Sequence, residues 1–216
     1  MNYLTGEIPS SLYNLSSLET LGLYDNQLEG TIPSDIGNAL PNLQILLMHD
    51  NRLEGRIPAS LSNASELNDL ELSLNAFHGM IPPSFGALQS LSWLELHGNQ
   101  LEARKPSDWS FITALANCSN LQVLDLANNL LQGMMPKSIV NLSTSLNTLA
   151  LGYNQLSGII PTEIEKFINL TYLDMGVNDF RGTIPAEISH LWQLQYLDLS
   201  NNMLSGEIPP TLGNLT

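Results

Sequence analysis

Residues 201–210 read NNMLSGEIPP, residues 25–33 read DNQLEGTIP and residues 153–161 read YNQLSGIIP. This motif returns nine times in 216 residues, and in every copy an Asn is followed two positions later by Leu or Phe and seven positions later by Pro. The successive Asn residues are 24, 25, 24, 24, 30, 25, 24 and 24 positions apart. A fixed period of this length indicates a chain built from one repeated structural unit.

Each later Asn is preceded by the pattern LxxLxLxxN, as in LQVLDLANN at 121–129 and LQYLDLSNN at 194–202. The alternation in L-x-L predicts a short strand with one buried face. Strands that recur every 24 residues have connections too long for hairpins, so we expect them to stack in parallel, one per coil. The sequence therefore predicts a single solenoid over residues 1–216, with about nine repeats of 24 residues.

The composition excludes several classes of function. The chain carries 7 Lys and Arg against 21 Asp and Glu, which argues against a nucleic-acid partner and permits a basic ligand. Cys118 is the only cysteine, so no internal disulfide is expected, and we predict a small buried side chain at that position. No catalytic motif is present. We therefore expect no enzymatic activity, no metal site and no cofactor in this chain.

The full consensus, LxxLxLxxNxLxGxIPxxLxxLxx, resembles the plant-type extracellular leucine-rich repeat. The resemblance implies an α/β solenoid, a right-handed superhelix or horseshoe with a parallel sheet on its concave face and short helical or 3-10 segments on its convex face. It also implies a second short strand at the G-x-I-P segment, with the Gly serving the tight turn. The resemblance further implies a buried ladder of Asn side chains, whose amide can satisfy both donors and acceptors of the turning backbone: Asn26, Asn51, Asn75, Asn99, Asn129, Asn154, Asn178 and Asn202.

The repeat is interrupted within residues 100–120, where six residues are added. We expect Ser107 to cap a short helix whose inward positions are Trp109, Ile112 and Leu115–Ala116. This helix is interpreted either as a longer segment that only packs on the convex side or as a docking or hinge element. The pattern W-x-F…L-x-N-C-S-x-L also resembles a repeat of one plant immune receptor-kinase group, which includes sensors of bacterial flagellin and elongation factor and rice bacterial-blight resistance receptors.

Six N-x-S/T sequons occur, and in five of them the Asn has the same repeat phase, away from the predicted strands. Asn169 is out of phase and is the weakest candidate. The repeat consensus N-L-S/T by itself also explains most of these sequons. However, N-glycans must point outward, and sequons at this repeat position would leave the strand face free of glycans. We predict N-glycosylation at these positions: Asn14, Asn63, Asn117, Asn141, Asn169 and Asn214.

The residues between the strand leucines point to the opposite face of the sheet, which is the ligand-binding face in the family that this chain resembles. A mixed apolar, aromatic and acidic cluster occupies this face in the first half. We predict that it contacts ligand: Tyr24, Ile45, Leu47, His49, Asp69, Glu71, Trp93, Glu95 and His97. Alternatively, this face is simply solvated, or it packs against a missing part of the chain. A column of acidic residues continues through Asp125, Asp174 and Asp198. Because Asp is common at this position of such repeats, the column can also be interpreted as an ordinary feature of the repeat without a role in binding.

The resemblance implies a ligand-binding segment of a plant receptor-like serine/threonine kinase ectodomain in immune or developmental signalling, on the extracellular side of the plasma membrane. A separate kinase domain, an extracellular peptide or protein ligand of basic charge and a co-receptor kinase are the expected associates. Because the chain starts within one repeat and stops before the next strand, we expect a fragment truncated at both ends. The alternatives are a secreted inhibitor of the pectinase-inhibitor type and a non-functional receptor remnant.

Overall fold

The L-x-L segments form short strands at the predicted positions. In the computed structural model, which describes residues 2–215, these strands join in parallel into an eight-stranded sheet with the order β16-β14-β12-β10-β8-β6-β4-β2. The solenoid predicted from the repeat is therefore confirmed. The strands are β2 (Thr20–Gly22), β4 (Ile45–Leu47), β6 (Asp69–Glu71), β8 (Trp93–Glu95), β10 (Val123–Asp125), β12 (Thr148–Ala150), β14 (Tyr172–Asp174) and β16 (Tyr196–Asp198).

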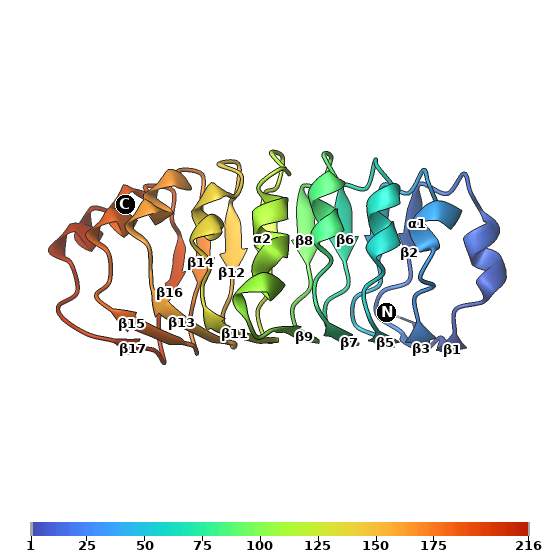
Figure 1. The fold of residues 1–216 in the computed structure, drawn as a ribbon, viewed down its shortest axis with the longest axis horizontal. Helices are drawn as coiled ribbons and strands as arrows, with labels where there is room; N and C mark the ends of the chain where they lie inside the picture. The colour runs from blue at the N-terminus through green and yellow to red at the C-terminus, as the bar shows by residue number, and fades with distance from the viewer. Residues whose placement is uncertain (1, 216) are drawn as a thin grey trace.

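A second parallel sheet has nine strands and runs along the lower edge of the solenoid in Figure 1. Apart from β1, its strands begin directly after the repeat Asn, and all of them end at least two residues before the repeat Pro, so they lie closer to the Asn than the G-x-I-P prediction placed them. The Pro, which has no N–H to donate to a ladder, lies outside every strand. The strands are β1 (Thr5–Glu7), β3 (Gln27–Thr31), β5 (Arg52–Gly55), β7 (Ala76–Gly79), β9 (Gln100–Ala103), β11 (Leu130–Met134), β13 (Gln155–Ile159), β15 (Asp179–Gly182) and β17 (Met203–Leu204).

Short helical segments cover one side of the eight-stranded sheet, and the two termini lie toward opposite ends of the row of coils (Figure 1). Within residues 2–215, no element covers the other side of that sheet, which carries the predicted ligand-binding residues. The segments are η1 (Ser10–Asn14), α1 (Ile36–Ala39), η2 (Ala59–Asn63), η3 (Pro83–Ala87), η4 (Pro106–Trp109), α2 (Ser110–Leu115), η5 (Lys137–Asn141), η6 (Thr162–Lys166), η7 (Ala186–His190) and η8 (Pro210–Asn214).

The repeat Asn side chains tie each coil to the preceding one. Asn99, which is 8% exposed, shows the pattern. Its Nδ2 donates to the carbonyls of Leu72 (3.0 Å), Leu96 (3.1 Å) and His97 (3.3 Å), and its Oδ1 accepts from the N–H of Phe77 (3.0 Å). The amide thus bonds backbone groups of two successive coils, among them the carbonyl of His97, which also accepts the N–H of Leu74 at 2.8 Å. Equivalent bonds are made by Asn51, Asn75, Asn129, Asn154, Asn178 and Asn202, and Asn26 makes them without the preceding-coil carbonyl.

The tight turn after each strand falls on the residue immediately before the ladder Asn, and not on the repeat Gly as predicted. These residues have a left-handed backbone, with φ of 52° at Leu74, 55° at Tyr153 and 51° at Val177. The repeat Gly is left-handed as well, but it lies within the second sheet or directly beside it, as at Gly30 (φ 85°). Bulky side chains rarely adopt this conformation, so the surrounding hydrogen bonds must impose it.

The added residues form η4 and α2, which lie on the convex side, and α2 packs against η3. Trp109, Ile112 and Leu115 are buried as predicted, and Phe111 is buried with them. The expected cap at Ser107 is wrong, because the carboxylate of Asp108 accepts the backbone N–H groups of Arg104 (3.0 Å) and Lys105 (3.2 Å) instead. Four buried side chains give the insertion a packing role.

Cys118 follows α2 and is fully buried, as predicted. Its Sγ lies 3.4 Å from the carbonyl of Phe85, and burial raises the pKa of the thiol to about 11. At neutral pH this thiol is therefore protonated and unreactive.

Candidate functional site

The nine predicted ligand-binding residues come from four neighbouring strands of the eight-stranded sheet or from the residues just after them. The register places Ile45, Asp69 and Trp93 side by side across β4, β6 and β8. In the same way Leu47, Glu71 and Glu95 form the adjacent row. All of these side chains keep contact with solvent. The structure therefore gathers the predicted residues on one uncovered surface, which we call the concave cluster: Tyr24, Ile45, Leu47, His49, Asp69, Glu71, Trp93, Glu95 and His97.

The first part of the concave cluster is an aromatic stack beside a carboxylate. The Tyr24 and His49 rings stack with their centroids 4.7 Å apart and their planes at 17°. The Nδ1 of His49 lies 2.8 Å from Oε2 of Glu71 on the next strand. Burial, with the charges of Asp69 and Glu95, raises the pKa of Glu71 in spite of the histidine. The carboxylates of Glu71, Asp69 and Glu95 therefore outnumber the single histidine, and this part of the concave cluster carries net negative charge.

Trp93 lies on β8, at one edge of the concave cluster and in the middle of the eight-stranded sheet. Its indole N–H donates to Oε1 of Glu95 at 2.8 Å, which fixes the ring on the sheet surface. Beside it, Oδ1 of Asp69 is buried and has no hydrogen-bond partner among the described residues. Burial raises the pKa of Asp69, and the charge of Glu95 raises it further. Three carboxylates thus surround one aromatic ring without a Lys or Arg beside them.

A second histidine repeats the geometry of the first. The Nδ1 of His97 lies 3.0 Å from Oδ2 of Asp125 on the following strand, and this contact raises the pKa of His97 above its usual value of 6.5. Glu95 and Glu71 raise it further. Each of the two histidines therefore has its own carboxylate. Among residues 2–215, no group of three side chains is arranged to hold a metal ion.

The later acidic column has a structural role. Oδ1 of Asp125 accepts the N–H of Ala127 at 2.9 Å, and Asp174 and Asp198 accept those of Gly176 and Ser200, each at 2.8 Å. A Cβ on Gly176 would lie 2.8 Å from a carboxylate oxygen of Asp198, so small residues in this column make room for the acid of the next coil. These aspartates fix the strand ends, which supports the interpretation of a routine repeat feature.

The sequence analysis did not select a tyrosine pair on the same face. The rings of Tyr172 and Tyr196 stack with centroids 4.2 Å apart and planes at 3°, in register across β14 and β16. Burial, contact with Tyr196 and the charges of Asp174 and Asp125 raise the pKa of Tyr172 to about 12. The repeat pattern could have revealed this pair, because Tyr172 and Tyr196 occupy the same repeat position as Trp93 in successive coils.

The His97–Asp125 pair predicts a pH-dependent contribution to stability. A base whose pKa is raised by folding stabilises the fold while it is protonated, so the contribution is complete below pH 6.5 and disappears as the pH rises through the raised pKa. Asp125→Asn keeps the oxygen that accepts the Ala127 N–H but removes the charge. We expect it to lower the pKa of His97, measured by NMR titration of the ring. The variant should have a lower unfolding free energy than the unchanged chain, and this difference should become smaller as the pH is raised from 6 to 8. If the substitution leaves the pKa of His97 unchanged, the pairing is contradicted.

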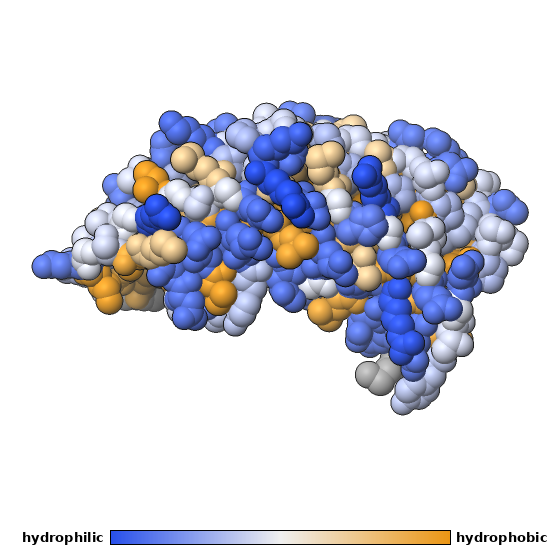
Figure 2. All heavy atoms as spheres, turned by 60° about the horizontal axis from the view of Figure 1, so that its bottom comes forward, coloured by the Kyte–Doolittle hydropathy of each residue, from blue (hydrophilic) through white to orange (hydrophobic). Residues whose placement is uncertain are grey.

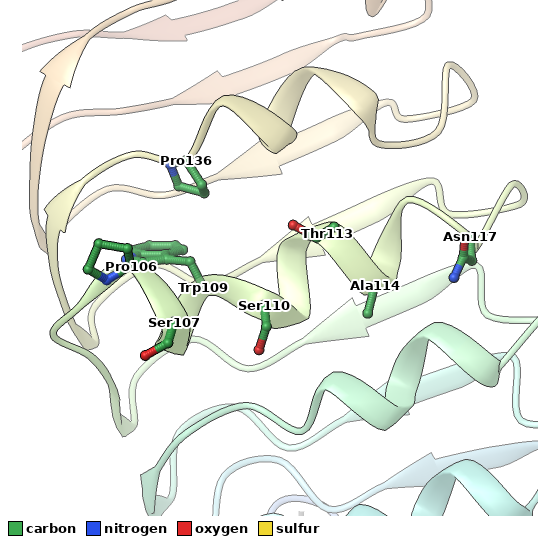
Figure 3. A pocket seen from close by; sticks show the side chains of 8 residues that line it. All are labelled: Pro106, Ser107, Trp109, Ser110, Thr113, Ala114, Asn117 and Pro136. Atoms are coloured by element: carbon green, nitrogen blue, oxygen red, sulfur yellow. The ribbon is translucent and has the colours of Figure 1, made fainter.

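Several other surfaces are hollowed. Figure 2 shows separate hydrophobic patches between hydrophilic side chains on the view that brings the nine-stranded sheet forward. A hollow of about 820 Å³ is lined largely by apolar side chains such as Ile57, Met80 and Ile81. A second hollow, of about 580 Å³, is lined by Met134, Ile159 and Val140. Another, of about 590 Å³, lies along α2 and is lined by Ser107 and Ser110 together with Pro106, Trp109 and Pro136 (Figure 3). None of these hollows combines an aromatic ring with carboxylates as the concave cluster does.

The Asn residues of all six sequons are exposed. Asn169, the candidate that is out of phase, donates its Nδ2 to the carbonyl of Thr144 at 2.9 Å, and its Oδ1 accepts from Gln193 at 3.2 Å. Asn63 likewise donates to Asn38 at 2.7 Å. A glycan on Nδ2 would leave one N–H and the Oδ1, so each of these bonds restricts the direction in which a glycan could leave the surface. The sequon of Asn214 ends at residue 216, which lies outside the described residues.

Comparison with known proteins identifies the fold family. Models of the leucine-rich repeat match residues 41–101, 119–180 and 144–204, and a further model of the same repeat matches residues 17–39. The chain belongs to the leucine-rich repeat family. No helix of this leucine-rich repeat chain, over the residues described, has the length and apolarity needed to cross a bilayer.

The relatives of this leucine-rich repeat chain include plant receptor kinases, as the resemblance implied, and also plant receptor-like proteins. The receptor kinase-like protein Xa21 of Oryza sativa subsp. japonica is 45% identical over 93 residues, which are 43% of this chain and 9% of that protein. The ectodomain of the Arabidopsis thaliana receptor kinase GASSHO1/SCHENGEN3, in complex with CASPARIAN STRIP INTEGRITY FACTOR 2, is similar with a TM-score of 0.84 and 34% identity, covering 99% of this chain and 28% of that one.

The Arabidopsis receptor kinase HAESA, in complex with the peptide hormone IDA and the co-receptor SERK1, is similar with a TM-score of 0.87 and 37% identity. This match covers 97% of the leucine-rich repeat chain and 34% of the HAESA chain. The repeat chain therefore spans less than a tenth of Xa21 and about a third of the HAESA ectodomain structure.

Proposed function

We propose that this chain is a ligand-recognition segment of a plant receptor-like serine/threonine kinase and that it binds an extracellular peptide through the concave cluster. The observation that carries this proposal is an uncovered sheet face with a fixed central indole, flanked by apolar and acidic side chains. Exposed aromatic and apolar groups on a sheet without a covering layer are typical of an interface. The similar GASSHO1/SCHENGEN3 and HAESA ectodomains were solved in complex with CASPARIAN STRIP INTEGRITY FACTOR 2 and with the peptide hormone IDA, which supports a ligand-binding role for this chain.

The proposal includes a location and a mode of action. The chain acts on the extracellular side of the plasma membrane, where its repeats bind ligand and a co-receptor kinase joins the complex. It carries out no catalysis itself, and signalling belongs to a kinase domain elsewhere in the protein. The role is in immune or developmental signalling.

Passage through the secretory pathway gives the extracellular location a direct test. When the 216-residue chain is expressed in plant cells with a secretion signal, we expect its mass to fall by several glycans after treatment with an N-glycosidase. Asn141→Gln should remove one of these increments, whereas Asn147→Gln, which alters no sequon, should remove none. A secreted chain without any glycan would contradict the glycosylation prediction.

Peptide selection tests the recognition surface without assuming a ligand. Peptides from an unbiased displayed library are selected on the chain, and their affinities are measured with Trp93→Ala and with Met134→Ala. We expect Trp93→Ala to weaken binding by about tenfold or more, as for a central aromatic contact, and Met134→Ala, on the nine-stranded sheet, to leave it unchanged. Selected peptides that respond only to Met134→Ala would overturn the concave assignment.

A further inference from the structure

Charge is segregated between the two sheets. Within residues 2–215, the outward positions of the eight-stranded sheet hold no Lys or Arg, although the chain has seven. All seven lie on the nine-stranded sheet, in the convex segments or between them: Arg52, Arg56, Arg104, Lys105, Lys137, Lys166 and Arg181. The concave face therefore carries negative charge without a fixed cation, and an occupant of opposite charge would complement it.

The acidic groups near Trp93 differ from the later aspartates. Asp125, Asp174 and Asp198 are engaged by backbone N–H groups of their own strands. Asp69 and Glu71 accept no backbone N–H. Oδ1 of Asp69 has no hydrogen-bond partner among the described residues, and Glu71 contacts the ring of His49 through Oε2. Oxygen atoms of both carboxylates are therefore available to a ligand.

Aromatic side chains mark two points on this face at a defined separation. Trp93 lies on β8 and Tyr172 on β14, three strand intervals away, which corresponds to about 14 Å at 4.8 Å per interval. An extended peptide advances about 3.4 Å per residue, so side chains four positions apart are also separated by about 14 Å. Both points have carboxylates beside them. At the first these are Asp69 and Glu71. At the second, Asp198 uses Oδ1 for the N–H of Ser200 and has a second oxygen outside that bond, whereas Asp174 is buried.

We propose that the ligand is a basic peptide that lies extended across the strands, with Lys or Arg side chains at positions i and i+4 that contact Trp93 and the Tyr172–Tyr196 stack. This inference rests on the proposed function and adds the charge and spacing of the ligand to it. A guanidinium can stack on an aromatic face while it pairs with a carboxylate, so each point offers both interactions.

Defined peptides test the proposal. The probes are fluorescein-labelled nine-residue peptides of Gly and Ser with Arg at positions 3 and 7, with Gln at both positions, or with Arg at positions 3 and 5. Their affinities for the 216-residue chain are measured by anisotropy at pH 7. We expect the peptide with Arg at 3 and 7 to bind about tenfold tighter than the Gln peptide, and tighter than the peptide with Arg at 3 and 5. The affinity should fall as salt is raised.

Matched variants separate a local contact from general attraction. Glu71→Gln with Glu95→Gln removes two charges from the concave cluster, and Glu29→Gln with Glu54→Gln removes two from the nine-stranded sheet. We expect the first pair to weaken binding of the Arg peptide about tenfold and the second pair less than twofold. Near-UV circular dichroism checks that both variants are folded, and Tyr172→Phe, which keeps the ring, should retain binding.

Equal losses in the two charge variants, or equal binding of the Arg and Gln peptides, would overturn the proposal. These results are distinguishable from a failure of the proposed function. If neutral peptides selected from the library still depend on Trp93, the concave face recognises peptides and only the basic class is wrong. If no peptide depends on Trp93, both are wrong.

Discussion

Asn99→Ala should lower the unfolding free energy of the chain by about 3 kcal/mol, because the substitution leaves buried backbone groups without partners. The amide of Asn99 accepts the N–H of Phe77 and donates to the carbonyl of Leu72, and both of these residues are fully buried. No water can replace the lost side chain inside a closely packed coil. The loss therefore includes the cost of unpaired donors and acceptors as well as the hydrogen bonds themselves.

An exposed Asn provides the control. Asn120 donates its Nδ2 to the carbonyl of Gln89 at 3.2 Å on the surface, where water can take over the contact. Asn120→Ala should therefore change the unfolding free energy by less than about 0.5 kcal/mol. Urea denaturation followed by circular dichroism measures both variants, and similar losses at the two positions would contradict the role of the ladder.

Gly86→Ala should destabilise the chain by about 2 kcal/mol through overpacking. Gly86 lies in η3, against which α2 packs, and a Cβ at this position would lie 2.5 Å from the carbonyl oxygen of Ala114 and 2.8 Å from its carbonyl carbon. Relief requires a shift of the α2 backbone, and α2 carries the buried side chains of the insertion. The predicted loss should appear as a lower denaturation midpoint.

The matched control is Gly213→Ala, since a Cβ there would meet no atom within 4 Å. That substitution should have little effect on the midpoint. Ala114→Gly should not rescue Gly86→Ala, because the carbonyl of residue 114 remains in place. Full rescue would show that the Ala114 side chain, and not the close backbone approach, limits the space at Gly86.

The strands, the Asn ladder positions and the arrangement of the concave cluster were predictable from the sequence, because each follows from the period and from L-x-L alternation. Once Asp69 and Trp93 have the same repeat position, a parallel solenoid must place them side by side. The turn position was predictable in part, because several coils place residue types there that favour a left-handed backbone, namely Asp25, Asp50, Gly98, Asn128 and Asn201. At Leu74, Tyr153 and Val177 the side chain gives no such signal, and the neighbouring coils impose the conformation.

The role of individual acids also required the structure. Glu71 and Asp174 occupy equivalent repeat positions, yet one contacts His49 and the other accepts the N–H of Gly176. The difference depends on side-chain length and on the size of the residue in the preceding coil, which are packing effects. The Asp108 cap was missed for a similar reason, because Ser107 and Asp108 are both good capping residues and only the backbone geometry decides between them.

Trp93 itself can report whether a peptide occupies the concave cluster. The chain has three tryptophans, and Trp109→Phe with Trp192→Phe leaves Trp93 as the sole indole. We predict that titration with the peptide carrying Arg at positions 3 and 7 changes Trp93 emission and that the change saturates at the same concentration as the anisotropy. Saturable anisotropy with unchanged Trp93 emission would show that peptides bind elsewhere and would contradict the assignment of the concave face as the recognition surface.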